Sequence, residues 1–119
     1  MKKILLLCGL LSIFSVSAQQ LLSSNKAPFH LGETKMVCGK ADEVFALNKR
    51  TVINLDGKYP SQTLSLLIWE DNKAMFDKKF GSLQALQGQR VCGLGKITEY
   101  KGHLQIVIKQ EQHLRLMKQ

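Results

Sequence analysis

Aromatic and basic side chains are neighbours at several places in the sequence, and this pairing is suited to binding. Tyr59 follows Lys58, and Tyr100 precedes Lys101 and His103. Cations attract phosphates, and bases stack on flat aromatic rings at roughly 1–3 kcal/mol each. These residue types therefore indicate single-stranded nucleic acid as a ligand, although each is equally compatible with a solvated turn or with cross-strand packing.

Patterns of catalytic residues are missing. The carboxylates that would have to cluster around a catalytic metal are spread along the chain, and they include Asp42, Glu43, Asp56, Glu70, Asp71, Asp77, Glu99 and Glu111. The histidines are equally scattered, and neither a Gly-rich phosphate loop nor a nucleophile elbow is present. We therefore expect no enzyme activity, no metal site and no cofactor.

Residues 1–18 have the layout of a secretory signal peptide. Two lysines precede an apolar run over residues 4–14, and small residues lead to Ala18 before the polar Gln19. The run is too short for a permanent membrane anchor. We therefore expect cleavage after Ala18 and a periplasmic or secreted protein without a stable membrane anchor.

Removal of this peptide leaves 101 of the 119 residues, which is enough for one domain. It also removes two lysines and lowers the formal net charge from +8 to +6. A basic domain of this size favours anionic partners such as nucleic acid, although the charge could equally serve solubility.

Two cysteines, Cys38 and Cys92, remain after cleavage. An even number in an exported chain suggests a disulfide bond. The chain-entropy account gives a loop of this length roughly 4 kcal/mol of stabilisation. No Cys-x-x-Cys motif or paired histidines accompany the two cysteines, which argues against zinc.

Hydrophobic periodicity predicts five short strands and one short helical region in residues 34–119, after a polar arm at residues 19–33 with little regular structure. Asp71 is the expected N-cap of the helical region, and Gly81 interrupts it. The helical region covers residues 71–86, and the strands cover residues 35–47, 51–55, 63–69, 90–99 and 104–109.

This order, with the helix between the third and fourth strands, is the layout of the OB-fold, a five-stranded Greek-key barrel in the all-β class. The sequence Val-Cys-Gly occurs at residues 37–39 and again at residues 91–93. The first and fourth strands of such a barrel are neighbours, so Cys38 and Cys92 would lie on adjacent strands. The fold and the disulfide are therefore consistent with each other.

Five motifs resemble bacterial OB-fold domains that are grouped with nucleic-acid-binding proteins. They are VCGK (37–40), INLDGKYP (53–60), LLIW (66–69), GQRVC (88–92) and GKITEYKG (95–102). The resemblance covers residues 34–108 and concerns the fold more than the function, because OB barrels bind DNA, RNA, sugars and proteins.

An OB barrel typically binds on the outer face of its second and third strands, between the flanking loops. In the third strand, Leu64, Leu66 and Ile68 should face the core, which turns Ser65, Leu67 and Trp69 outward. The predicted nucleic-acid-binding residues are Lys49, Arg50, Asn54, Lys58, Tyr59, Ser65, Trp69, Tyr100, Lys101 and His103.

Two functions fit this surface. The first is binding of nucleic acid, in particular single-stranded DNA, with little sequence preference and outside the cytoplasm. The second is a periplasmic adaptor that binds an envelope protein or a small ligand through the same face. Leu67 and Trp69, both turned outward, fit either a protein contact or a stacked base.

Overall fold

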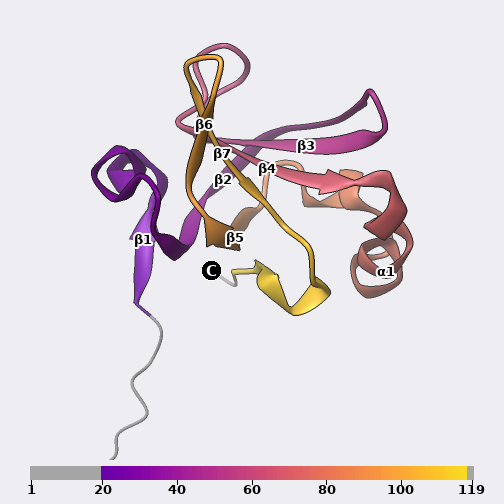
Figure 1. The fold of residues 1–119 in the computed structure, drawn as a ribbon. Helices are drawn as coiled ribbons and strands as arrows, with labels where there is room; N and C mark the ends of the chain where they lie inside the picture. The colour runs from indigo at the N-terminus through magenta and orange to yellow at the C-terminus, as the bar shows by residue number, and fades with distance from the viewer. Residues whose placement is uncertain (1–19, 118–119) are drawn as a thin grey trace, which may run out of the picture.

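The computed structural model describes residues 20–117, so the predicted signal peptide lies outside the described residues. The described chain is mostly β, with eight strands in one hydrogen-bonded sheet (Figure 1). The strands are β1 (Leu21–Ser23), β2 (Thr34–Leu47), β3 (Arg50–Leu55), β4 (Leu64–Trp69), β5 (Arg90–Lys96), β6 (Thr98–Tyr100), β7 (His103–Val107) and β8 (Leu114–Leu116).

One α-helix, α1 (Glu70–Phe80), follows β4 directly, and three short 3₁₀ segments complete the elements. These segments are η2 (Ser24–His30), η3 (Leu83–Leu86) and η4 (Glu111–His113). None of the helices within residues 20–117 combines the length and apolar character that crossing a bilayer requires.

The strand order is β6-β7-β4-β3-β2-β5-β8, and β1 pairs with β2 outside this path. The β2–β3, β3–β4 and β2–β5 pairs are antiparallel, whereas β4 and β7 are parallel. A helix between the third and fourth long strands, and a parallel contact between the third strand and the last hairpin, agree with the predicted OB-type arrangement.

The predicted closed barrel of five strands differs from the structure, in which the hydrogen-bonded ladder has eight strands and is open. The expected fourth strand, residues 90–99, breaks at Ile97 into β5 and β6. The Ile97 N–H donates to the Glu33 carbonyl oxygen, and the Ile97 carbonyl accepts from Gly32. The backbone groups of Ile97 are thus bonded to residues 32–33, and the expected continuous strand over residues 90–99 is interrupted at this point.

The core lies on the inner face of the sheet and is closed by α1. Leu64, Leu66 and Ile68 are fully buried, as the alternation in β4 predicts, and Phe76 of α1 joins them. Gly93 faces inward from β5, and a Cβ there would come within 2.7 Å of the Leu66 side chain. The glycine in a strand position is therefore explained by close packing.

Asp71 was expected to cap the helix, and this prediction is wrong. The helix begins at Glu70, with Trp69 at the N-cap position, two residues before Asp71, and no side-chain cap. Because β4 runs directly into α1, the Lys49 carbonyl of the β2–β3 turn accepts from the Glu70 N–H. This backbone contact satisfies one of the free amides that a capping side chain would otherwise bind.

The polar arm at residues 19–33 was expected to have little regular structure, yet it forms β1 and η2. Its Ser24 is 1% exposed and donates to the Asp56 carboxylate at 2.5 Å, and it also contacts the Thr63 hydroxyl. Ala27 is fully buried in the core. A third of the residues of the arm are apolar, and the arm is ordered because β1 pairs with β2 and because Leu22 and Ala27 pack against the core.

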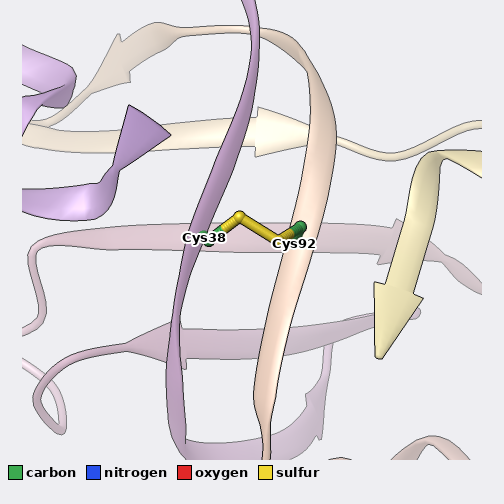
Figure 2. The surroundings of a disulfide bond; sticks show 2 residues. All are labelled: Cys38 and Cys92. Carbon is green, nitrogen blue, oxygen red and sulfur yellow. A yellow bond between two sulfur atoms is a disulfide. The ribbon is translucent and has the colours of Figure 1, made fainter. Parts of the chain in front are cut away.

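The predicted disulfide between Cys38 and Cys92 is confirmed, with an S–S distance of 1.98 Å (Figure 2). The two residues are directly opposite in the β2–β5 register. Both point away from the main core into a small second cluster, which contains Met36 and the partly buried Leu94 and Met117. The disulfide thus covers the outer face of this strand pair.

Candidate ligand-binding groove

The outer face of β2, β3 and β4 carries three rows of side chains that run across the strands. The strand register defines them, because directly opposite residues on neighbouring strands project from the same face. The polar row is Glu43, Asn54 and Ser65, extended to Gln105 of β7; the apolar row is Phe45, Val52 and Leu67; the end row is Leu47, Arg50 and Trp69.

These rows form the floor of a groove of ≈ 930 Å³. Its remaining walls come from the β2–β3 turn, the β3–β4 loop and the β6–β7 hairpin, through Asn48, Tyr59, Gln62, Tyr100, Lys101, His103 and Leu104. The floor is well packed, since Val52, Leu67 and Ser65 are at most 8% exposed. The outward side chains of β4 are therefore covered by their neighbours, except for Trp69 at the end.

Aromatic rings border both ends of the groove, each beside a basic or imidazole group. At one end, the Arg50 guanidinium lies 5.8 Å from the centre of the Trp69 ring. At the other end, the β3–β4 loop meets the β6–β7 hairpin (Figure 1), and the Tyr59 and His103 rings are 5.5 Å apart. The Lys101 ammonium lies 5.4 Å from the Tyr100 ring in the same hairpin.

These rings are accessible. Trp69 is 44% exposed, Tyr100 56% and Tyr59 64%. Cations beside aromatic faces hold the rings in place and add positive charge at the points where a planar ligand would stack. The groove can therefore stack flat groups at both ends, with the apolar row, also called the apolar strip, between them.

Hydrogen bonds link the first three side chains of the polar row, Glu43, Asn54 and Ser65. Asn54 donates through Nδ2 to Glu43 Oε1 at 2.8 Å and accepts through Oδ1 from the Ser65 hydroxyl at 2.5 Å. The same Glu43 oxygen accepts from the Tyr59 backbone N–H at 2.9 Å. The Tyr59 N–H and then Asn54 hold the pKa of Glu43 below its ordinary value, and the charge of Lys58 adds to this effect. Glu43 is therefore ionised at neutral pH.

The structure brings eight of the ten predicted site residues to this groove, which leaves Lys49 and Lys58 outside its lining. Lys49 lines a smaller neighbouring hollow of ≈ 220 Å³ next to α1. Lys58 is exposed in the β3–β4 loop and acts on the site only through its charge near Glu43.

The sequence interpretation overlooked the contribution of β2. Glu43, Phe45 and Leu47 lie on one face of that strand and supply the first residue of each row. Their period of two was visible in the sequence, but a β-bulge between Ala41 and Glu43 shifts the face that they occupy. Gln62 was overlooked as well, because nothing in a loop sequence shows that its side chain turns into the groove.

Within residues 20–117, no group of three or more His, Cys, Asp or Glu side chains is arranged to hold a metal ion. Glu43 is the one carboxylate among the side chains that line the groove. The arrangement thus offers stacking surfaces, positive charge and a polar floor.

By sequence, no family model and no curated protein matches the chain. By structure, it is similar to a chain of the S. pombe Stn1–Ten1 complex, with a TM-score of 0.54 and 14% identity over 72% of this chain and 59% of that one. It is also similar to an OBody bound to hen egg-white lysozyme, with a TM-score of 0.61 and 14% identity over 88% of this chain and all of that one.

A Leishmania major Friedlin protein assigned as an aspartyl-tRNA synthetase is similar over 90% of this chain, with a TM-score of 0.60 and 10% identity. This chain spans only 22% of that protein, and it spans less than two thirds of the S. pombe chain. At such identities the likeness shows the fold alone, and it supports the predicted OB-type fold but not the five-stranded Greek-key barrel.

Proposed function

We propose that the groove binds single-stranded nucleic acid, in particular DNA, with weak sequence selectivity and without catalysing a reaction. One observation carries the proposal: three exposed aromatic rings border the groove, and each lies beside a basic or imidazole side chain. Aromatic platforms combined with positive charge are the means by which OB-type barrels hold single strands.

In this arrangement the nucleic-acid strand lies along the groove from the β6–β7 hairpin to Trp69. Bases stack on Tyr59, Tyr100 and Trp69, while Arg50 and Lys101 attract the phosphates. Phe45, Val52 and Leu67 provide an apolar strip for sugars and base edges between these ends. Stacking is indifferent to base identity because every base has a flat face, so the strip and the rings supply affinity without strong selectivity.

We also propose that the protein acts outside the cytoplasm. The Cys38–Cys92 disulfide supports this location, since structural disulfides persist in oxidising compartments. The predicted signal peptide is independent support. The absence of catalysis is supported by the single carboxylate of the groove, which is engaged by Asn54 and the Tyr59 backbone.

Trp69, the only tryptophan in the chain, reports binding directly. Titration with single-stranded oligonucleotides should quench its fluorescence, with an affinity that falls as salt rises. In an anisotropy assay with a labelled oligonucleotide, Trp69→Ala should weaken binding by roughly 5- to 150-fold, which corresponds to the loss of one stacked base.

Phe29→Ala is the matched control, because Phe29 is 77% exposed but lies on η2, away from the groove lining. It should leave the affinity unchanged. Absence of quenching at low salt, or equal losses in the two variants, would reject the proposal.

A second function is favoured by the apolar strip itself. Phe45, Val52 and Leu67, with Leu47 at 46% exposure beside them, would suit an apolar segment of an envelope protein. The lysozyme-bound OBody chains show that a protein of this fold can bind another protein. Capture from envelope extract with and without nuclease separates the two functions, because a partner that is retained after nuclease treatment favours the adaptor.

A further inference from the structure

The polar row has a fixed direction that begins at Glu43. An ionised carboxylate only accepts hydrogen bonds, so the Asn54 group that faces it must be the NH₂. The Asn54 oxygen then faces Ser65, and the Ser65 hydroxyl must donate its single proton to it. Each orientation in the row follows from the negative charge at its start.

The same reasoning determines the orientation of the Gln62 amide. Because Ser65 has given its proton to Asn54, its oxygen can only accept, and the Gln62 NH₂ approaches it at 3.5 Å. This orientation leaves the Gln62 side-chain oxygen, Oε1, as a free acceptor. That atom is shielded from solvent and has no hydrogen-bond partner among the described residues.

The acceptor that a ligand in the groove can reach is therefore at the Glu43 end of the row. Here Asn54 and the Tyr59 N–H both donate to Oε1 of Glu43, and no donor within residues 20–117 lies at hydrogen-bond distance from the second carboxylate oxygen. Both Glu43 and Gln62 line the groove next to Tyr59. A base stacked on the Tyr59 or His103 ring would thus have its edge over a floor that accepts hydrogen bonds.

We propose that this end of the groove selects bases whose edge offers N–H donors, guanine first, and disfavours thymine. The inference rests on the proposed function, since it names the base that the nucleic-acid groove prefers at one position. Glu43 is the specificity-determining residue.

The chemistry of the bases sets the order. Guanine presents a ring N–H and an amino group side by side, and both can donate to the second Glu43 oxygen, because a carboxylate oxygen has two lone pairs. Cytosine and adenine present one amino group each and should be intermediate. Thymine flanks its single N–H with two carbonyl oxygens, and at least one of these would face the carboxylate without a donor. Such unpaired acceptors are costly to bury.

The test uses short thymine oligonucleotides that carry one central guanine, one central inosine, or thymine only. Inosine lacks the amino group of guanine but keeps its shape, and a single guanine avoids four-stranded structures. The wild-type protein should bind the guanine oligonucleotide roughly tenfold more tightly than the thymine oligonucleotide, with inosine in between. Since these measurements need no variant, they do not depend on the folding of a mutant.

Glu43→Gln then tests the residue. Its amide oxygen must still accept from Tyr59 and Asn54, so its NH₂ replaces the free acceptor, and the preference for guanine should disappear. Glu111→Gln removes the same charge from η4, outside the groove lining, and should keep the preference. The thermal unfolding of both variants shows that they remain folded.

The outcomes separate the two proposals. Equal affinity of wild type for all three oligonucleotides, or tighter binding of thymine, overturns the selectivity but leaves nucleic-acid binding intact. A preference that survives in Glu43→Gln overturns the role of Glu43. No binding to any oligonucleotide at low salt overturns the proposed function and the inference that rests on it.

Discussion

The two outer faces of the sheet differ in what covers them. On the β2–β5 pair, the outward side chains are Met36, Cys38, Cys92 and Leu94, and a disulfide joins the strands directly (Figure 2). On the β3–β4 pair, the outward side chains form the polar, apolar and end rows of an open groove. Both faces belong to one sheet and share one core.

The difference shows how a small domain divides its tasks. The disulfide stabilises the fold and covers one face with sulfur and methyl groups, which have little capacity for directed hydrogen bonds. The other face keeps a carboxylate, an amide, a hydroxyl and exposed rings. Stability on one side allows polar and exposed groups on the other, because a domain of this size has only a few kcal/mol of net stability.

The largest expected effect comes from removal of the disulfide. The double substitution Cys38→Ala with Cys92→Ala opens a loop with a sequence separation of 54, and it should lower the free energy of unfolding by roughly 4 kcal/mol. Denaturant titration of the oxidised wild type and the double variant measures this change.

Oligonucleotide affinity, measured where both proteins are folded, should be unchanged in the double variant, because Cys38 and Cys92 do not line the groove. A loss of affinity in the folded double variant would contradict the division between the two faces.

Much of the fold could be predicted from the sequence, because local patterns determine it. The alternation in residues 64–69 identifies the core face of β4, and the strand order identifies the OB-type layout. The OB-type strand order correctly placed Cys38 and Cys92 on adjacent strands. These features depend on neighbouring residues or on a known strand order.

The parts that could not be predicted depend on contacts between distant segments. The break at Ile97 arises from hydrogen bonds to residues 32–33, and the ordered arm depends on Ser24 reaching Asp56 and Thr63. In the groove, the aromatic and basic residues could be identified from the sequence because their residue types alone suggest ligand binding. The role of Glu43 was hidden, because a bulge in β2 determines the face on which it lies.

A moderate effect is expected from Asn54, which belongs to the open face but is 1% exposed. Asn54→Ala leaves Glu43 without one of its donors and the buried Ser65 hydroxyl without its acceptor, so it should cost roughly 1–3 kcal/mol of stability. Chemical denaturation measures this change.

Gln105→Ala, in the same row, is the matched control and should change the free energy of unfolding by less than about 0.5 kcal/mol. If Asn54→Ala lowered the free energy of unfolding as little as Gln105→Ala, the polar row would contribute nothing to stability. Only the disulfide-bonded face would then stabilise the fold.

The smallest effect is expected from acid. Glu43 has a pKa below its ordinary value of 4.5, so its hydrogen bonds stabilise the folded state above pH 4.5, and this contribution is lost as the pH falls through the lowered pKa. Between pH 7 and pH 3.5, Glu43→Gln should therefore lose slightly less thermal stability than wild type, since its amide stays uncharged throughout.

Glu111→Gln should follow the wild type over the same range. If the Glu43→Gln variant also followed the wild type, the carboxylate would contribute nothing to folding, and its ionisation would matter only for the ligand. The guanine preference should be lost as the pH falls through the lowered pKa of Glu43, because a protonated Glu43 can turn a donor toward the groove.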